Sequence, residues 1–453
     1  MKIGIVGWGL EAQSAFRYFG PEHEYLIVNE SRQDNFPPQT DKIQVRFLAT
    51  DAPVGIGGQV SDLSYLEGIE KCDKIVYQPT SYFNLKKVFG DDSDFWGKAT
   101  TAYDIFFEAT PSKKIIGITG TKGKGTTSTL IAKMLEAAGE TVHLGGNIGT
   151  PILDLLPDIK PDDWIVWELA NFQLKPASHS PHIAVCLMIA PEHLDWHPDM
   201  QDYVEAKANL FKFQKPEDIA IYFENDEHSK HIAGYSPGQK IPYFYKPGAA
   251  VRADRKIVIG EGETEIIDLS EIKLLGEHNL QNICAALTAV WQVSQDTGAF
   301  KEVLSSFSGL EHRLEFVRDL DGVLYYDDSF GTNPDTTMVA LRAIIQPVVL
   351  ILGGHDKGLD YTELIKEITS QEKVRHVITI GEIGPKLAGM LRAHGFNAVT
   401  EGLRAMPQIV AEARAHAQPG DAVLLSCGTS SFGLFKDYKD RGDQFKQAVR
   451  ALA

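Results

Sequence analysis

The stretch Gly117–Ile131, which reads GITGTKGKGTTSTLI, decides the fold of this chain. An apolar, strand-like segment, KIIGITG, leads into a loop of glycines and lysines, and the helix-like run TTSTLIAKMLEAAG follows. A strand, a glycine-rich loop and a helix in this order are typical of a phosphate-binding loop, whose backbone N–H groups surround the phosphates of a nucleotide. The stretch therefore predicts a nucleoside triphosphate site built on Gly120, Gly123 and Lys124.

One position of this loop departs from the usual pattern. Ser or Thr normally follows the lysine and provides the hydroxyl that binds magnesium, whereas Gly125 follows Lys124 here. We predict that Thr126 provides this hydroxyl, with Thr127 as the alternative. The other loop residues that we expect to contact the nucleotide are Thr121, Lys122 and Gly125.

Strand-like and helix-like segments alternate through the rest of the chain. WIVWEL, IAVCLMI and DIAIYF follow the loop, and GVLYYDD, VVLILGG, HVITIGE and AVLLSCG lie in the last third. This alternation predicts parallel, doubly wound sheets, and 453 residues are too many for a single core. We expect an α/β protein with a Rossmann-like domain over 1–105, a central P-loop ATPase-type parallel-sheet domain over 106–309 and a Rossmann-like α/β domain over 310–453.

The N-terminus contains a second glycine-rich turn, in KIGIVGWGLEAQS, where Gly7, Gly9 and Ala12 follow an apolar segment. The next strand-like segment, YLIVNE, ends at Glu30. This is the outline of a mononucleotide-binding unit, in which glycines let a phosphate approach the start of a helix. By itself the pattern leaves three possibilities open: a NAD site, a nucleotide-sugar site and a tight turn without a ligand.

Charge and composition exclude several classes of protein. The formal net charge of −17 argues against nucleic acid as a partner, because duplex binding requires a basic face. The apolar runs are shorter than the roughly 20 residues that span a bilayer, and we expect no signal peptide before the first strand. The four cysteines form no CxxC pair, which favours buried, reduced thiols. We expect a cytoplasmic protein that binds neither nucleic acid nor membranes.

The loop GTKGKGTT resembles the GTNGK(G)[ST]T signature of the Mur ligase and folylpolyglutamate synthase superfamily. Its GKG form is most similar to the folylpolyglutamate branch, but later segments resemble motifs of the glutamate-adding Mur ligases in the order of that family. These segments are GGNIGTPILD, WELANFQL, PEHLDWH, YVEAKANLF, GEHNLQNICAAL, LEHRLEFV, DDSFGTNPDTT, LILGGHDKGLDY and SSFGLFKDYKDRGDQF.

The resemblance implies an ATP-dependent ligase that joins a carboxylate to an amine and releases ADP. The expected reaction adds glutamate, with D-glutamate first, to UDP-N-acetylmuramoyl-L-alanine through an acyl phosphate. It belongs to peptidoglycan precursor synthesis, and so to cell wall biogenesis, cell shape and cell division. We expect a monomer. The alternatives are a Mur-like ligase for L-glutamate or another amino acid, a folylpolyglutamate synthase-like enzyme and a non-catalytic nucleotide-binding relative.

The resemblance also implies the catalytic residues, which include Lys124, and two magnesium ions. Thr126 and Glu168 would hold the first ion, and His193 and Lys207 the second. The ammonium group of a lysine repels magnesium, so Lys207 would first react with carbon dioxide to form an anionic carbamate.

Further residues are implied for the three substrates. For ATP these are Asn279 and Asn282 at the adenine, Arg313 at the phosphates and Asp328 at the ribose. For the UDP-linked acceptor they are Gly9, Leu10, Glu11, Glu30 and Asn147. For the incoming amino acid they are Thr332, Lys357, Ser431 and Tyr438. Phe330 stands where the family has a lysine, which keeps the identity of the amino acid open.

Overall fold

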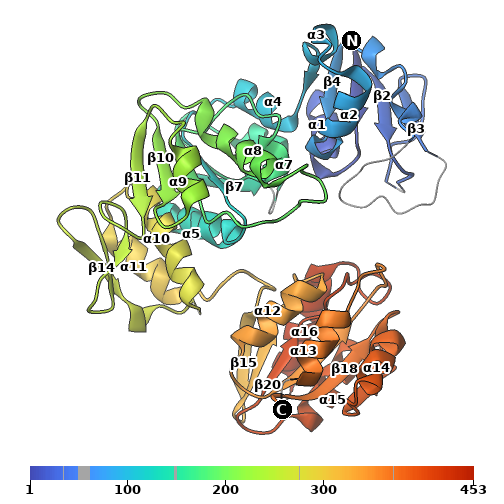
Figure 1. The fold of residues 1–453 in the computed structure, drawn as a ribbon, viewed down its shortest axis with the longest axis vertical. Coiled ribbons are helices and arrows are strands. Elements are labelled where there is room, and N and C mark those ends of the chain that lie inside the picture. Colours follow the sequence, from blue (N-terminus) through green and yellow to red (C-terminus); the bar gives the residue numbers. More distant parts are fainter. Residues whose placement is uncertain (34, 49–61, 147–149, 275, 371, 453) are drawn as a thin grey trace. The chain divides into compact units, whose positions relative to one another are not determined.

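Three of the four sheets found among the described residues consist mainly of parallel strands, which confirms the predicted α/β class. The computed structural model describes residues 1–33, 35–48, 62–146, 150–274, 276–370 and 372–452. The chain divides into two compact units, Met1–Lys273 with Glu277–Ser306, and Leu274–Gly276 with Phe307–Ala453 (Figure 1).

The first unit begins with five parallel strands in the order β3-β2-β1-β4-β5. The strands are β1 (Lys2–Val6), β2 (Glu24–Asn29), β3 (Ile43–Phe47), β4 (Lys74–Tyr77) and β5 (Ala99–Thr100). The helices are α1 (Leu10–Phe19), α2 (Tyr82–Phe89), α3 (Ser93–Trp96) and α4 (Ala102–Ala109). Strand β1 is buried on both faces, because Ile3 and Ile5 pack with α1 while Val6 belongs to a second cluster with Leu66 and Ile69.

The second sheet of this unit has six parallel strands in the order β11-β10-β9-β6-β8-β7. The strands are β6 (Ile115–Thr119), β7 (Val142–Gly146), β8 (Trp164–Glu168), β9 (Ile183–Cys186), β10 (Ile219–Phe223) and β11 (Gln239–Tyr243). The helices are α5 (Lys124–Ala137), α6 (Ile152–Leu155), α7 (Asn171–Leu174), α8 (Met200–Lys212), α9 (Glu227–Ala233), α10 (Glu277–Val290) and α11 (Thr297–Ser306). Strand β6 lies between β8 and β9, in the interior of the sheet. The loop that follows β6 lies at the carboxyl edge of the sheet, where ligands bind in open α/β folds.

Two features of this region were not predicted from the sequence. Helix α10 ends at Val290 and turns at 291–293, and α11 then packs against α5, so α10 is not the last helix of the unit. A small antiparallel sheet, which the sequence did not predict, consists of β12 (Ala250–Val251), β13 (Lys256–Ile259) and β14 (Thr264–Asp268). Strands of two to five residues are too short for a clear alternating pattern.

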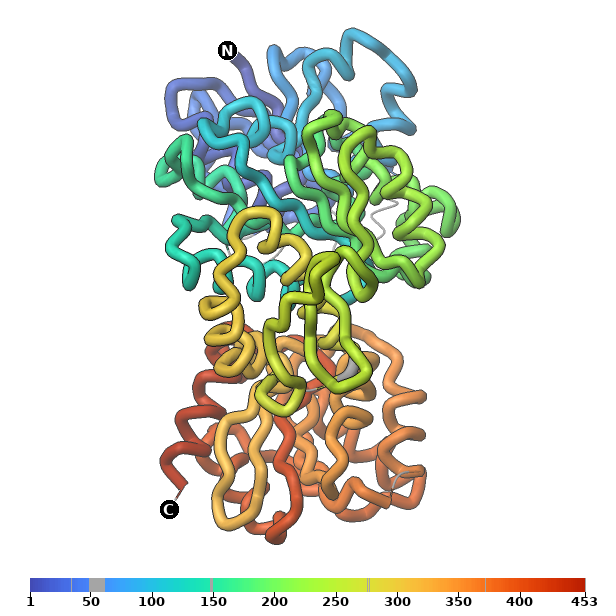
Figure 2. The backbone as a smooth tube through the Cα atoms, turned by 90° about the vertical axis from the view of Figure 1, so that its left-hand side faces the viewer, coloured from blue at the N-terminus to red at the C-terminus, as the bar shows by residue number. Residues whose placement is uncertain are grey.

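The second unit contains a six-stranded sheet in the order β15-β16-β20-β17-β18-β19, in which only β15 is antiparallel to its neighbour. The strands are β15 (Glu315–Leu320), β16 (Val323–Asp327), β17 (Val348–Gly353), β18 (Val374–Ile380), β19 (Val399–Glu401) and β20 (Ala422–Leu425). The helices are α12 (Pro334–Ala343), α13 (Thr362–Ser370), α14 (Gly384–Ala393), α15 (Met406–His416) and α16 (Tyr438–Ala451). The last helix, α16, packs beside the β15–β16 hairpin (Figure 2).

The predicted domain boundary between residues 105 and 106 stays a prediction. Helix α1 contacts α4 and α6, and one apolar cluster contains residues from both sheets of the first unit. The second unit starts close to the other predicted boundary, between residues 309 and 310.

The cysteines and helices agree with the expectations from composition. All four cysteines are buried thiols. Within the described ranges, every helix is too short or too polar to cross a membrane.

Candidate functional site

The phosphate-binding loop connects the buried strand β6 to helix α5. Gly120 and Gly123 have φ angles of 143° and 90°, which glycine adopts without the strain that a side chain would cause. A Cβ atom at Gly120 would lie 2.6 Å from the Cβ of Leu187, so the loop also has no room for a side chain there. The turn at Gly123 begins a helix of 14 residues, whose first N–H groups lack partners within the helix and suit an anion.

Lysines and threonines of the loop have distinct surroundings. The ammonium of Lys124 donates hydrogen bonds to the carbonyl oxygens of Gly120 and Thr121, at 3.0 Å each. The Thr121 hydroxyl lies 3.0 Å from the carbonyl oxygen of Ala190, and the backbone N–H of Thr121 donates to the carbonyl oxygen of Met188. Thr121 therefore braces the loop against the segment after β9. Of the remaining predicted residues, Lys122 is exposed and Gly125 is buried.

The two threonines predicted for magnesium differ in accessibility. Thr127 is fully buried, and its hydroxyl has no hydrogen-bond partner among the described atoms. Thr126 retains 8% exposure in the first turn of α5. Only Thr126 therefore keeps contact with the space above the loop.

Lys207 lies on α8 and is buried against the same loop. Its ammonium donates to the carbonyl oxygen of Gly120 at 3.0 Å and lies 4.6 Å from the ring centre of Tyr203. Burial, together with the positive charge of Lys124, lowers the pKa of Lys207 to about 7. A substantial fraction of this side chain is therefore a neutral amine near neutral pH.

Glu168 and His193 lie at or beyond the carboxyl ends of the two strands that flank β6. Glu168 ends β8, is 3% exposed and is paired in register with Ile118. His193 lies in the loop after β9 with φ of 56°, and its ring packs 4.8 Å from that of Phe172. Burial lowers the pKa of His193, which favours the neutral imidazole that can bind a metal.

The predicted adenine pair lies beside the phosphate-binding loop. Asn282 donates to the side-chain oxygen of Asn279 at 2.8 Å, and both are buried on α10. A Cβ atom at Gly123 would collide with the amide oxygen of Asn282. The glycine is therefore required both by its φ angle and by this close approach.

A hydrogen-bonded chain behind His193 was not predicted. The ring of His197 lies 2.8 Å from the Asn171 amide and 2.6 Å from the Asp202 carboxylate. Lys175 also pairs with Asp202. Trp196 links this loop to the turn after β4, since its indole N–H donates to the carbonyl oxygen of Thr80 at 3.1 Å. Helical spacing could have indicated Tyr203, one turn before Lys207, but no local pattern joins these other residues.

At the N-terminal glycine turn, a side chain occupies the position expected for a phosphate. The N–H of Gly9 donates to the amide oxygen of Gln78 at 3.0 Å, and a Cβ atom at Gly7 or Gly9 would lie within 2.7 Å of Gln78 atoms. Leu10, at the start of α1, is 68% exposed. Gln78 was not among the predicted site residues, because only the fold brings the end of β4 beside this turn.

The acidic residues predicted for the UDP-linked substrate are both engaged within the protein. Glu11 accepts a hydrogen bond from Gln173, and Glu30 accepts one from Asn84 at 2.7 Å. Burial raises the pKa of both carboxyl groups. The fifth predicted residue, Asn147, lies outside the described residues.

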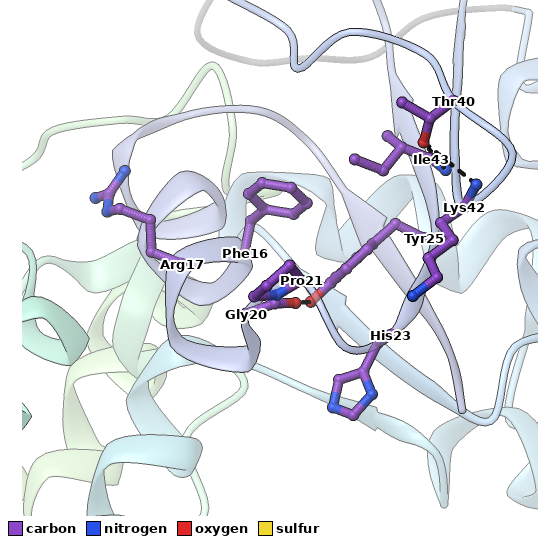
Figure 3. A pocket seen from close by; sticks show the side chains of 9 residues that line it. All are labelled: Phe16, Arg17, Gly20, Pro21, His23, Tyr25, Thr40, Lys42 and Ile43. Carbon is purple, nitrogen blue, oxygen red and sulfur yellow. Dashed lines mark hydrogen bonds between the residues drawn. The ribbon is translucent and has the colours of Figure 1, made fainter.

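The described part of the first unit includes two cavities. One of about 420 Å³ adjoins Phe16, Gly20 and Tyr25 at the end of α1 opposite the Gly7–Gly9 turn (Figure 3). The other, of about 500 Å³, lies between α2 and the loop after β9, and its lining includes Lys86 and Trp196. Only the second cavity adjoins the loop that carries His193.

In the second unit, Arg313 and Asp328 are held by contacts within that unit. The guanidinium carbon of Arg313 lies 4.6 Å from the ring centre of Phe330. Asp328 accepts hydrogen bonds from the N–H of Leu314 at 3.2 Å and from the hydroxyl of Ser426 at 2.7 Å. Burial raises the pKa of Asp328 to about 7.

The residues predicted for the amino acid follow three adjacent strands of this sheet. Thr332 follows β16, Lys357 follows β17 and Ser431 follows β20, so all three lie at the carboxyl edge. Hydrogen bonds between residues 355 and 429–430 join two of these loops. The ring of Tyr438 meets that of Phe330 edge-on at 5.2 Å. The fold thus gathers the four predicted residues on one side of the second unit.

The geometry defines a nucleotide-binding α/β protein, and comparison with known proteins identifies its family. The model of the Mur ligase middle domain matches residues 118–290, and that of the Mur ligase glutamate ligase domain matches residues 312–428. The UDP-N-acetylmuramoylalanine–D-glutamate ligase of Clostridium tetani is 33% identical over 460 residues, covering 100% of this chain and 97% of the relative. The chain therefore belongs to the Mur ligase family.

Two further similarities agree with this assignment. The UDP-N-acetylmuramoylalanine–D-glutamate ligase of Acetivibrio thermocellus is 35% identical over 400 residues, covering 86% of this chain and 84% of the relative. The crystal structure of the UDP-N-acetylmuramate-alanine ligase MurC from Thermotoga maritima is 15% identical, with a TM-score of 0.56 over 100% of this chain and 99% of that one. The second similarity supports the fold alone.

Proposed function

We propose that this chain is an ATP-dependent ligase that joins D-glutamate to UDP-N-acetylmuramoyl-L-alanine in peptidoglycan precursor synthesis. The names of the full-length relatives support the substrates. The observation that carries the chemistry is Lys207, buried against the phosphate-binding loop and beside Lys124. We also propose the three-domain, Rossmann-like arrangement and a cytoplasmic monomer.

The reaction requires activation of a carboxylate. A carboxylate oxygen of the acceptor attacks the γ-phosphorus of ATP, and the bond to the ADP oxygen breaks. The amine of glutamate then attacks the acyl carbon, releasing phosphate and losing a proton. Both steps concentrate negative charge, so the catalytic groups should be cations and N–H donors held in fixed positions.

The residues of the first unit suit this chemistry. Lys124 and the start of α5 would hold the ATP phosphates, and Asn279 and Asn282 the adenine. Thr126 and Glu168 offer oxygen atoms, the ligands that magnesium prefers, and His193 and Lys207 would complete a second site. When bound, magnesium would neutralise the phosphate charge.

Lys207 fits such a site only after modification. As a neutral amine, its nitrogen can attack carbon dioxide, forming an N–C bond and releasing a proton to solvent. The resulting carbamate is anionic and would face Lys124, which removes the repulsion between two ammonium groups. This change supports carbamylation as a resident feature of the enzyme.

The acceptor would extend from the Gly7–Gly9 turn toward His193. Gly9, Leu10 and Glu11 begin α1, and Asn147 follows β7. The diphosphate would take the position of the Gln78 amide oxygen at the Gly9 N–H. Glu30 would contribute at the end of β2.

We further propose that Arg313 and Asp328 of the second unit bind ATP, and that the four residues predicted for the amino acid bind glutamate. Asp328 would hold the ribose and Lys357 the side-chain carboxylate of glutamate. Phe330 favours a second candidate, a ligase for L-glutamate or another amino acid, because an aromatic ring replaces a cation beside this pocket.

One experiment separates these candidates. Phosphate release should be measured with UDP-N-acetylmuramoyl-L-alanine, magnesium, bicarbonate and a panel of D- and L-amino acids, followed by mass spectrometry of the product. We expect turnover with D-glutamate and one new amide bond per ATP. Preference for another amino acid would mean that D-glutamate is not the substrate. Absence of acceptor-dependent ATP consumption would refute the proposed ligase function.

A further inference from the structure

Three metal-binding side chains converge on the second unit, away from the predicted ATP and amino-acid residues. His376 comes from β18, and Glu412 and His416 lie one helical turn apart at the end of α15. One donor atom from each lies within 4.8 Å of the other two. His376 is near the start of its strand, whereas the amino-acid residues follow the carboxyl ends of neighbouring strands.

Stacking and hydrogen bonds hold the three side chains of this cluster close together. The rings of His376 and His416 are stacked, with centres 3.6 Å apart and planes at 8°. The Nε2 atom of His416 lies 3.2 Å from a Glu412 carboxylate oxygen. Thr400 joins the other two, since its hydroxyl lies 2.9 Å from Nε2 of His376 and donates to the same Glu412 oxygen at 2.9 Å.

The charges around the cluster leave room for a cation. In the described part of the chain, Glu412 forms no ion pair with a lysine or arginine. The nearby Arg375 is directed to Asp421 at 3.0 Å, and Arg414 to Asp321 at 3.4 Å. The carboxylate charge is therefore balanced only by the imidazoles.

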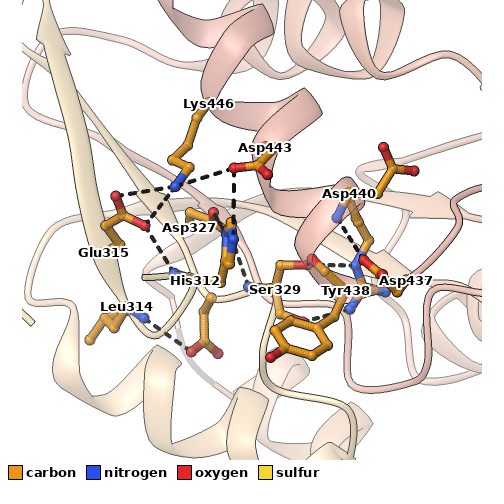
Figure 4. A network of polar contacts seen from close by, with 12 residues as sticks. His312, Leu314, Glu315, Asp327, Ser329, Asp437, Tyr438, Asp440, Asp443 and Lys446 are labelled. Atoms are coloured by element: carbon orange, nitrogen blue, oxygen red, sulfur yellow. Dashed lines mark hydrogen bonds and ion pairs between the residues drawn. The ribbon is translucent and has the colours of Figure 1, made fainter. Parts of the chain in front are cut away.

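A second histidine–carboxylate cluster provides a contrast. The ring of His312 lies 2.7 Å from the Asp327 carboxylate, and the backbone N–H of His312 donates to the Glu315 carboxylate (Figure 4). Lys446 pairs with Glu315 at 3.2 Å and with Asp443 at 3.5 Å. The ammonium group of Lys446 already balances carboxylate charge in this cluster, so a metal ion is not required there.

We propose that His376, Glu412 and His416 form a binding site for a divalent transition metal such as Zn²⁺. Two imidazoles and one carboxylate, with water in the remaining position, are a ligand set that zinc accepts. Zinc ligands at about 2.0–2.2 Å from the ion lie about 3.5 Å apart. Binding would require the partly exposed His416, at the end of α15, to rotate out of the stack, because imidazole lone pairs lie in the ring plane and two stacked rings do not both point at one ion.

Such an ion would join β18 to the end of α15. The ion would stabilise the second unit, because a ligand that binds only the folded protein raises the unfolding temperature. It would take no part in the amide-forming reaction. Its effect is therefore distinguishable from that of magnesium at the ATP site.

The test uses the full-length protein with excess magnesium, so that the proposed ATP-linked sites are occupied. Zinc chloride is titrated by calorimetry, and unfolding temperature is measured with and without zinc. The variants are His416→Gln and Glu412→Gln, which change partly exposed side chains. The control is His394→Gln, an exposed histidine at the end of α14 whose ring bonds to its own helix.

We expect wild type and His394→Gln to bind zinc and to unfold at a higher temperature with it. His416→Gln and Glu412→Gln should bind at least about tenfold more weakly and lose the zinc-dependent shift, while their unfolding without zinc and their ATP turnover stay unchanged. Cobalt should give an absorption band in wild type that disappears in His416→Gln. Equal zinc affinity in wild type and His416→Gln, or no zinc binding by wild type, would overturn the proposal.

Discussion

Lys124 and Lys207 donate hydrogen bonds to the same carbonyl oxygen, that of Gly120, each at 3.0 Å. Two ammonium groups on one acceptor repel each other, and this repulsion adds to burial in lowering the pKa of Lys207 to about 7. Lys207 comes from a helix more than 80 residues beyond the loop. This contact therefore gives Lys207, which lies on the amphipathic helix α8, a pKa well below that of an ordinary lysine.

Replacing Lys207 should abolish ligation while preserving the fold. Lys207→Met keeps most of the buried volume and removes a disfavoured buried charge, so we expect thermal unfolding at or above the wild-type temperature. Acceptor-dependent phosphate release should fall by about 10²–10³-fold. Lys207→Arg, which stays charged and forms no carbamate, should be equally inactive. Turnover near the wild-type level in either variant would exclude a carbamate role.

Carbamate formation should depend on pH through the ionisation of Lys207. The folded pKa of about 7 lies below the ordinary lysine value, so the neutral amine increases as pH rises through about 7. At constant dissolved carbon dioxide, the ratio of carbamate to unmodified lysine, measured by ¹³C NMR, should rise about a hundredfold per pH unit below about pH 7 and about tenfold per unit above it, because carbamate formation releases a proton in addition to the one lost by the ammonium. Lys207→Arg should lack the signal. A change of slope near pH 10 instead of near pH 7 would indicate an ordinary lysine.

The two threonines of the loop should respond differently to mutation. Thr126→Ala should raise the magnesium concentration needed for ATP turnover by about tenfold or more, because it removes a proposed ligand. Thr127→Val preserves shape and removes a buried hydroxyl without a described partner, so it should change neither magnesium dependence nor stability substantially. Magnesium titrations of phosphate release compare the two, and a larger effect at Thr127 would reassign the hydroxyl.

Phe330 should act by holding Arg313. Phe330→Leu removes the ring below the guanidinium, and a cation–π contact of about 0.5–1 kcal/mol corresponds to a two- to fivefold effect. We expect the KM for ATP to rise by about that factor in Phe330→Leu and to stay close to the wild-type value in Phe330→Tyr. The same loss in both variants would mean that the ring does not position Arg313.

Gln78 should compete with the acceptor for the Gly9 N–H. Gln78→Ser shortens the side chain and leaves this donor available, so the KM for UDP-N-acetylmuramoyl-L-alanine should fall several-fold, by about 1 kcal/mol for one hydrogen bond. The KM for ATP should stay unchanged. An increase in the acceptor KM would show that the Gln78 amide binds the substrate instead of blocking it.

Much of the fold was predictable because its signals are local. The glycine turn, Lys124 and the apolar strand before them specify a phosphate-binding loop, and the alternating segments specify parallel sheets. The small antiparallel sheet and the end of α10 were not predictable, because short strands and helix ends depend on packing against other segments.

The candidate site was likewise predictable only where its signals are local in the sequence. Motif order indicated Glu168, His193 and Lys207 as candidate site residues, but it contained no sign of Gln78 beside Gly9 or of Phe330 below Arg313. These pairs are separated by 69 residues in the first case, and in the second they depend on how the turn after β16 is folded.

The sequence by itself determined the class of fold, the nucleotide loop and the family to which the chain belongs, because each follows from residue types at short, fixed spacings. Only the tertiary structure decided the chemical state of Lys207, the occupant of the N-terminal glycine turn and the meeting of His376 with His416. Charge state and side-chain partners depend on burial and on neighbours distant in the chain, and these exist only once the sheets and helices have packed together.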